Sequence, residues 1–274
     1  MNTKSVSLSK AFSTGWNTFT KYPGVLIGGF LIYIAMVLVL EMIFMIPMIL
    51  VTTRMPQSTD LSSPMFGVQT GFSVAFPIVV VFLFAPLVGG LFILLLNAVR
   101  DSNPGINDLF AGFRKYWKWV GLFFLYYLAT YAAFIPELIG ILVSTKMMHV
   151  GSAAAVSTVL GIAIMGLGIA ISLVIMFILL TRWLFIYCAA ADGAGIIESF
   201  GKSAEMTKGI RLPLFGILIV LWLFATAGII ACGIGVILTS IIASLAITSM
   251  YVDLKNQMSG TAPSASAPEP EPGQ

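Results

Sequence analysis

The chain has 274 residues, of which 59% are hydrophobic and only 9% are charged, and its formal net charge is +3. A soluble domain carries about 25% charged residues. So few charges cannot cover the surface of a water-soluble fold of this length, so lipid must be part of the solvent. Composition therefore excludes an ordinary soluble protein and predicts an all-α integral membrane protein.

The N-terminal segment predicts a short helix that lies in the membrane interface. It has no continuous apolar run and no small-residue cleavage site, so no removable signal peptide is expected. From Leu8 to Phe19, apolar residues recur every three or four positions, with Ser, Lys, Thr and Asn between them. Such a stretch is too short to cross a bilayer and is amphipathic, which is typical of an in-plane helix.

Apolar segments of membrane-spanning length follow. About 20 apolar residues are needed to cross the hydrocarbon core. Four segments reach this length: 25–51, 74–99, 120–143 and 153–181. A fifth run, 212–252, is long enough for two crossings, and Gly233 and Gly235 at its midpoint suit a turn. We therefore expect six transmembrane helices, with one very oblique helix over 212–252 as the alternative.

The cations are distributed unequally between the two sets of connecting segments. The loops after the first and third spans and the turn after the fifth carry only Arg54 and Lys146. Because positive residues stay on the cytoplasmic side, both termini are predicted to be cytoplasmic. The cations on that side are Lys4, Lys10, Lys21, Arg100, Arg114, Lys115, Lys118, Lys202, Lys208, Arg211 and Lys255.

The same order of segments occurs three times. The repeats cover about residues 7–101, 104–192 and 195–253. They align on three phenylalanines at spacings of 98 and 90 residues: Phe12, Phe110 and Phe200. Each repeat ends with an aspartate at the point where the chain is expected to leave the bilayer: Asp101, Asp192 and Asp253. Each contains two crossings, so the units point the same way and predict parallel repeats. The alternative is that amphipathic linkers simply join the hairpins of any hairpin-built membrane protein.

The second and third repeats also begin with amphipathic stretches. One runs from Ile106 to Trp117, and the other runs from Ile197 to Thr207, where Glu198 and Lys202 can pair at i,i+4. We expect the three in-plane helices to form a cytoplasmic collar around a six-helix bundle over residues 1–255. Residues 256–274 are rich in Pro, Ser, Ala and Glu, and we expect a disordered tail there.

Two acids lie within the apolar spans. A charged side chain in a bilayer usually faces protein or water, so Glu41 and Glu137 are candidate transport residues. Both lie late in outward-running spans, so the alternative is that they bond locally or reach water at the outer rim. Neither is paired with a plausible nucleophile, which argues against an intramembrane enzyme.

Four basic residues are candidates for lipid contact. Arg114, Lys115 and Lys118 belong to the second amphipathic stretch, and Arg182 follows the uncharged fourth span. Arginine can chelate a phosphate with two hydrogen bonds, so these residues suit anionic headgroups. For Arg182 the alternative is snorkelling at the end of a helix.

Motifs for other chemistries are absent from the sequence. It has no P-loop, GxSxG or CxxC pattern, and its single histidine, His149, has no ligand partner nearby. Cys188 and Cys232 lie in apolar sequence and are expected to be buried hydrophobic residues. No catalytic residue, cofactor or metal is predicted, and basic residues facing anionic lipid give no support for nucleic-acid binding.

Several local patterns together resemble a known family. They are Ala11-Phe12 with Gly15-Trp16, Asp108-Leu109-Phe110 with Gly112-Phe113, Ala191-Asp192 with Glu198, Lys202-Ser203 with Thr207-Lys208-Gly209, and Cys232-Gly233-Ile234-Gly235. Over about residues 7–255 the chain resembles uncharacterised bacterial six-helix proteins similar to the membrane domain of glycerophosphoryl diester phosphodiesterases. The resemblance implies a bacterial inner-membrane domain. It transfers no catalytic residue, and the soluble phosphodiesterase barrel is missing from the sequence.

Two functions follow from these observations. The first is a non-enzymatic membrane module that binds lipid, or a membrane or cytoplasmic protein, through its cytoplasmic collar. The second is a transporter or channel for a small or amphipathic solute, for which Glu41, Glu137 and the intramembrane prolines are the supporting features.

Overall fold

The computed structural model describes residues 6–54, 64–149, 154–231 and 234–260. All the regular secondary structure in these ranges is helical. Within the described residues, five helices are long and apolar enough to cross a membrane, and a pair of helices bent by 101° makes a sixth if it is counted as one span. The predicted all-α class is therefore confirmed, with five or six helical segments of the length and composition that a membrane span needs.

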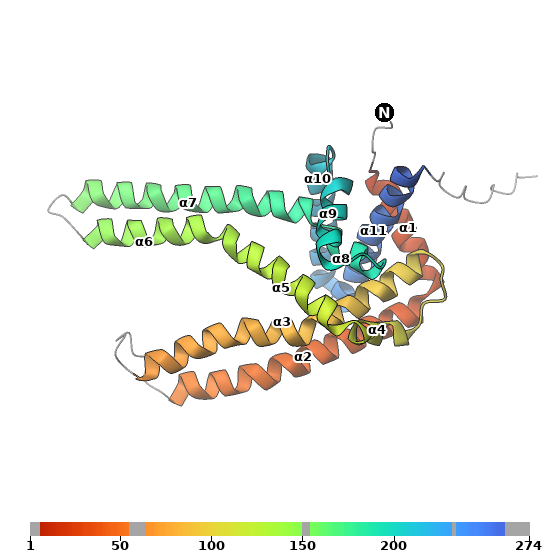
Figure 1. Cartoon of the computed structure of the whole chain (residues 1–274), viewed down its shortest axis with the longest axis horizontal. Helices are drawn as coiled ribbons and strands as arrows, with labels where there is room; N and C mark the ends of the chain where they lie inside the picture. The colour runs from red at the N-terminus through yellow and green to blue at the C-terminus, as the bar shows by residue number, and fades with distance from the viewer. Residues whose placement is uncertain (1–5, 55–63, 150–153, 232–233, 261–274) are drawn as a thin grey trace, which may run out of the picture.

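Two long helical arms extend along the long axis of the molecule to the same side (Figure 1). The first arm pairs α2 (Pro23–Arg54) with α3 (Pro64–Val99). The second arm pairs α5 (Tyr116–Ala133) and α6 (Ile135–His149) with α7 (Ala154–Arg182). Much of the apolar surface of these arms is exposed, as expected for helices whose solvent is lipid.

The second arm bends where one predicted span divides into α5 and α6. The break falls at Phe134, just before Pro136, which lacks an N–H group and suits only the first turn of a helix. The N–H group of Glu137 has no helical partner at this new helix start, and it donates to Ser172 Oγ of α7 at 3.2 Å. By contrast, α2 continues through Pro47.

The remaining helices gather at the base of the arms. There α8 (Ile186–Ala191) and α9 (Ile196–Met206) lead into α10 (Arg211–Ala227). After the short 3₁₀ helix η2 (Gly228–Ala231), the chain returns through α11 (Ile234–Ser259). The predicted division of the run 212–252 into two helices is therefore confirmed. Because α11 continues to Ser259, residues 256–259 are helical rather than part of a disordered tail, and residues 261–274 lie outside the described residues.

The three amphipathic stretches begin at the predicted spacing but differ in form. The helix α1 (Leu8–Lys21), the 3₁₀ helix η1 (Ile106–Phe110) and α9 start 98 and 90 residues apart. The prediction of one continuous helix over Ile106 to Trp117 was wrong. After η1 comes the single turn α4 (Ala111–Arg114), the chain bends at Lys115, and Trp117 belongs to α5.

The first amphipathic helix runs antiparallel along the last long helix. Lys10 of α1 pairs with Asp253, Ser249 Oγ donates to the Ala11 carbonyl, and Gly15 packs against the backbone near Ile242. This order of contacts places the start of α1 beside the end of α11. The buried residues of α1 are small, so the two helices approach closely in the way typical of membrane helices.

The η1–α4 segment lies directly on α3 because two glycines remove the intervening side chains. A Cβ atom on Gly90 of α3 would lie 1.7 Å from the Leu109 carbonyl oxygen. A Cβ atom on Gly112 of α4 would lie 1.9 Å from the carbonyl oxygen of Pro86. Leu109 is fully buried in this contact. The sharp bends that replace a continuous helix here follow from this close backbone approach.

We expect Gly112→Ala to detach this segment from α3 and to lower the apparent melting temperature of the detergent-solubilised protein by several degrees. The physical reason is a clash between two backbones, which no side-chain rotation can relieve. Differential scanning fluorimetry measures the change. Gly216→Ala in α10 is the matched control, because a Cβ atom there has no neighbour within 4 Å. An unchanged melting temperature for Gly112→Ala would contradict the close contact.

Candidate anion-binding site

Three of the predicted basic residues meet at one cavity. The cavity has a volume of about 450 Å³ and lies where α3, α4, α5 and α8 come together. Its basic lining comes from the end of α4 and the first turn of α5. The residues that line it are Ile93, Ala111, Arg114, Lys115, Lys118, Trp119, Ala190 and Ala191. The basic residues, which are close together in the sequence, therefore face a wall formed by Ala190 and Ala191, which are distant from them in the sequence.

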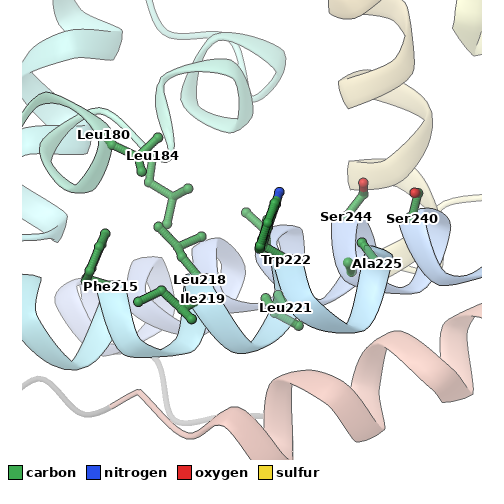
Figure 2. A pocket seen from close by; sticks show the side chains of 12 residues that line it. Leu180, Leu184, Phe215, Leu218, Ile219, Leu221, Trp222, Ala225, Ser240 and Ser244 are labelled. Carbon is green, nitrogen blue, oxygen red and sulfur yellow. The ribbon is translucent and has the colours of Figure 1, made fainter. Parts of the chain in front are cut away.

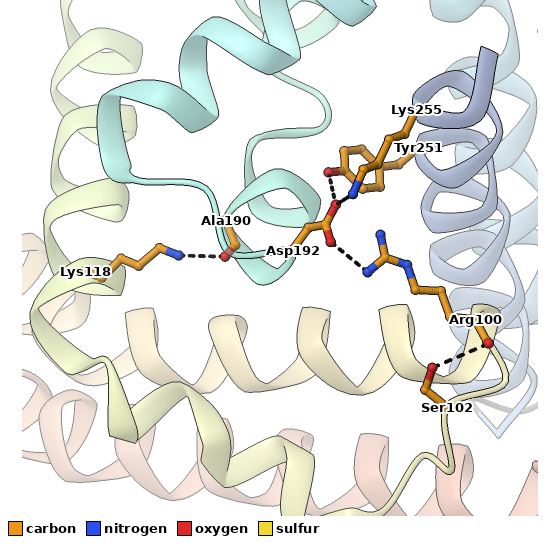
Figure 3. Close-up of polar contacts among 7 residues, drawn as sticks. All are labelled: Arg100, Ser102, Lys118, Ala190, Asp192, Tyr251 and Lys255. Carbon is orange, nitrogen blue, oxygen red and sulfur yellow. Dashed lines mark hydrogen bonds and ion pairs between the residues drawn. The ribbon is translucent and has the colours of Figure 1, made fainter. Parts of the chain in front are cut away.

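Backbone geometry decides how the three cations are presented. Arg114 is the last residue of α4, Lys115 occupies the bend, and Lys118 lies in the first turn of α5. Lys118 Nζ donates to the Ala190 carbonyl oxygen of α8 at 2.7 Å (Figure 3). The same Nζ lies 5.8 Å from the centre of the Trp119 ring. Lys118 is thus oriented, while the side chains of Arg114 and Lys115 are exposed.

No carboxylate is among the described residues that line this cavity. Glu198 of α9 is the acid that interacts electrostatically with Lys118. Its carboxylate is held by Lys202 at 2.8 Å and accepts a hydrogen bond from the Gly195 N–H at 2.9 Å. The hydrogen bonds from Lys202 and Gly195 lower the pKa of Glu198, so it remains ionised and engaged within α9. The cavity therefore keeps an excess of positive charge.

A second polar cluster lies on the other side of α8, centred on Asp192 (Figure 3). Its carboxylate binds Arg100 at 2.7 Å, accepts a hydrogen bond from Tyr251 at 2.8 Å, and pairs with Lys255. Arg100 follows α3, whereas Tyr251 and Lys255 belong to α11. The side chain of Asp192 is only 11% exposed. One nearly buried carboxylate thus joins the ends of three helices, α3, α8 and α11.

Burial and pairing act in opposite directions on this carboxylate. Burial opposes its ionisation, but the hydrogen bonds from Arg100, Lys255 and Tyr251 outweigh burial and bring the pKa of Asp192 to about 2. An unfolded aspartate has a pKa of about 3.9. Because the folded pKa is the lower one, this cluster stabilises the fold fully above about pH 4. The stabilisation is lost as the pH falls through about 2.

We expect Asp192→Asn to destabilise the protein by roughly 2 kcal/mol at neutral pH, because the ionised partners lose their counter-charge. The apparent melting temperature should fall by about 5 °C. The difference between wild type and variant should shrink as the pH is lowered from about 4 towards 2. Thermal denaturation in detergent at several pH values measures both effects.

The control for this prediction is Asp253→Asn. Asp253 pairs with Lys10 at 3.0 Å, but both side chains are substantially exposed, so the pair should contribute less than about 1 kcal/mol. If Asp192→Asn and Asp253→Asn were equally mild, the Asp192 cluster would have no special structural role.

The fourth predicted lipid contact, Arg182, lies away from the basic cavity. It ends α7, its side chain is exposed, and it forms no ion pair within the described ranges. Its backbone carbonyl accepts hydrogen bonds from Ser203 Oγ at 2.9 Å and from Thr207 Oγ1 at 3.4 Å. Ser203 Oγ also accepts from the Phe185 N–H at 3.1 Å. The hydroxyls of α9 thus hold the turn between α7 and α8.

The two predicted transport acids lie on different arms. Glu41 is exposed on α2, and Glu137 is half-buried in the first turn of α6. Because α2 and α6 end later in the chain than the predicted spans do, each acid lies roughly 20 Å short of the end of its helix. An acid in the first turn of a helix is stabilised by the helix dipole, which gives Glu137 a local role. Their place at the outer interface stays a prediction.

An apolar cavity of about 490 Å³ runs along α10, between this helix, the end of α7 and α11 (Figure 2). Trp222 projects into it from α10, and the hydroxyls of Ser240 and Ser244 lie along its α11 side. It shares no lining residue with the basic cavity. Its lining suits hydrocarbon rather than a charged ligand.

Comparison of the chain with protein families, curated proteins and solved structures finds no match.

The sequence pattern groups Arg114, Lys115 and Lys118, which line one cavity, but gives no indication of the Asp192 cluster. From the sequence, the aspartates that close the predicted repeats indicate only the membrane boundary. In the structure each is paired: Asp101 with Lys21 at 2.5 Å, Asp253 with Lys10, and Asp192 with Arg100 and Lys255. Their regular recurrence beside basic residues was the available signal.

Proposed function

We propose that the chain is a non-enzymatic membrane module that binds anionic lipid headgroups at the cavity of Arg114, Lys115 and Lys118. The observation that supports this most directly is that three cations line one cavity whose described lining contains no carboxylate. Clusters of Lys and Arg at the cytoplasmic end of membrane helices attract anionic lipids, and basic pockets between helices bind their headgroups.

The chemistry of the cavity favours phosphate recognition. The Arg114 guanidinium offers a planar fork that can bind two phosphate oxygens. Lys115 and Lys118 add point charges, and the hydrogen bond from Lys118 to Ala190 limits the motion of one of them. The described residues of the lining include neither a histidine, a carboxylate nor a hydroxyl nucleophile, so the cavity suits binding rather than turnover.

This function requires the cavity to face the cytoplasmic leaflet. We propose six crossings arranged as three parallel repeats, with both termini in the cytoplasm of a bacterial inner membrane. The unequal distribution of cations supports this orientation. The matched starts of α1, η1 and α9 support the repeats. The resemblance to the membrane domain of glycerophosphoryl diester phosphodiesterases remains a prediction from local patterns.

We expect the triple variant Arg114→Gln, Lys115→Gln and Lys118→Gln to lose most of its retention of anionic lipid. Native mass spectrometry of protein released from bilayers that contain phosphatidylglycerol and phosphatidylcholine measures the retained lipid. The physical reason is that each Lys or Arg near an anionic surface contributes about 1 kcal/mol.

The matched control removes the same number of charges elsewhere, with Lys10→Gln, Lys21→Gln and Lys208→Gln. Lys10 and Lys21 lie in α1, Lys208 follows α9, and none of the three lines the basic cavity. Equal losses in the two triple variants would mean that net charge alone retains the lipid. No loss in either variant would refute the proposed function.

A further inference from the structure

We infer that the cavity of Arg114, Lys115 and Lys118 selects lipids whose headgroup is a phosphate monoester, such as phosphatidic acid, over phosphodiester lipids. This inference rests on the proposed function and specifies the ligand of the same site. Three observations support it. Three cations line the cavity, no acid is among its described lining residues, and the adjacent residue of α4, Phe113, lines an apolar cavity.

The charge of the cavity favours a dianionic headgroup. A phosphodiester headgroup carries one negative charge, whereas a phosphate monoester carries nearly two at neutral pH. Three cations around one cavity exceed what a monoanion can neutralise, and no carboxylate that would balance them is among the described residues of the lining. A dianion with three free oxygens can engage Arg114 by two hydrogen bonds and also reach a lysine.

The wall of the cavity favours a phosphate at the very end of its headgroup. A monoester phosphate ends its headgroup, so nothing beyond it must fit against the α8 wall formed by Ala190 and Ala191. Lys118 Nζ already donates a hydrogen bond to the Ala190 carbonyl oxygen at 2.7 Å, which holds this wall close to the cations. A phosphodiester would have to place its alcohol group against the wall or turn it out to water.

The neighbouring apolar cavity favours a lipid over free phosphate. Phe113 and Arg114 are consecutive residues of α4 that line different cavities. Arg114 lines the basic cavity, whereas Phe113 lines an apolar cavity of about 380 Å³ formed with α2 and α3. A ligand at this helix therefore meets cations on one side and hydrocarbon-like surface on the other. A phosphate attached to acyl chains satisfies both.

A phosphate monoester gains its second negative charge near pH 6, so the ligand itself titrates between about pH 5.5 and 7.5. The charged groups that face it are the three cations and the Glu198–Lys202 pair of α9. Tyr116, also at the start of α5, donates its hydroxyl to the Phe82 carbonyl oxygen at 3.0 Å. We expect the affinity for a monoester lipid to rise over this interval, as the charge of the ligand rises.

The experiment compares the full-length protein in phosphatidylcholine nanodiscs that contain equal mole fractions of either phosphatidic acid or phosphatidylglycerol. Lipid retention is measured by native mass spectrometry at about pH 5.5 and about pH 7.5. We expect phosphatidic acid to be retained about threefold more than phosphatidylglycerol at the higher pH. This preference should shrink at the lower pH and disappear in the Arg114, Lys115 and Lys118 triple Gln variant.

Each other outcome has a distinct meaning. If both anionic lipids are retained equally, and the triple Gln variant loses both, the monoester inference is overturned while the proposed function stands. If neither is retained above phosphatidylcholine, the proposed function fails as well. If inorganic phosphate displaces phosphatidic acid at matching concentration, the ligand is soluble phosphate and the lipid part of the inference is overturned. A phosphatidic acid preference that persists in the triple Gln variant would place the site elsewhere.

Discussion

The arrangement of the helices depends on one nearly buried carboxylate, that of Asp192. Lipid tails are as apolar as the arms, so the hydrophobic effect gives the arms little reason to associate within a membrane. Their relative placement must come from polar bonds and close packing at their base. Asp192 joins the end of α3, through Arg100, to α11, through Tyr251 and Lys255. A charge removed from water persists only when such partners compensate it, so the cluster specifies one arrangement.

The helix α8 connects the Asp192 cluster to the basic cavity, because Asp192 directly follows it and Ala190 within it binds Lys118. This helix has only six residues, too few to be stable by its internal hydrogen bonds, so its position is set by what holds its two ends. At its start, Ser203 of α9 accepts a hydrogen bond from the Phe185 N–H. At its end, Asp192 is fixed on one side, and the Ala190 carbonyl binds Lys118 on the other. The wall opposite the cations is therefore held by the same contacts that hold the fold.

How much of this could be predicted from sequence depends on the range of the interactions. The long spans, the turn within residues 212–252 and the starts of α1 and α9 follow from local hydropathy and periodicity, and they were predicted. The clustering of Arg114, Lys115 and Lys118 is local as well. The broken form of η1 and α4 was not predicted, because it depends on Gly90 and Gly112, which let two backbones touch. The wall of the cavity opposite the cations could not be predicted either, because Ala190 lies 72 residues from Lys118 in the sequence.

The position of the basic cavity explains why charge is concentrated there. An exposed cation in water contributes little to the binding energy of an anion, because solvent and salt screen its charge. A cation beside low-dielectric protein and lipid interacts more strongly with an anion, since less water separates the two charges. Trp119, which is buried, and Ile93 supply such a surface on one side of the three cations. Phe113 extends apolar surface to the other side of α4. The short helix α4 thus has a basic cavity on one side and an apolar cavity on the other. An anionic lipid likewise joins a charged headgroup to hydrocarbon chains.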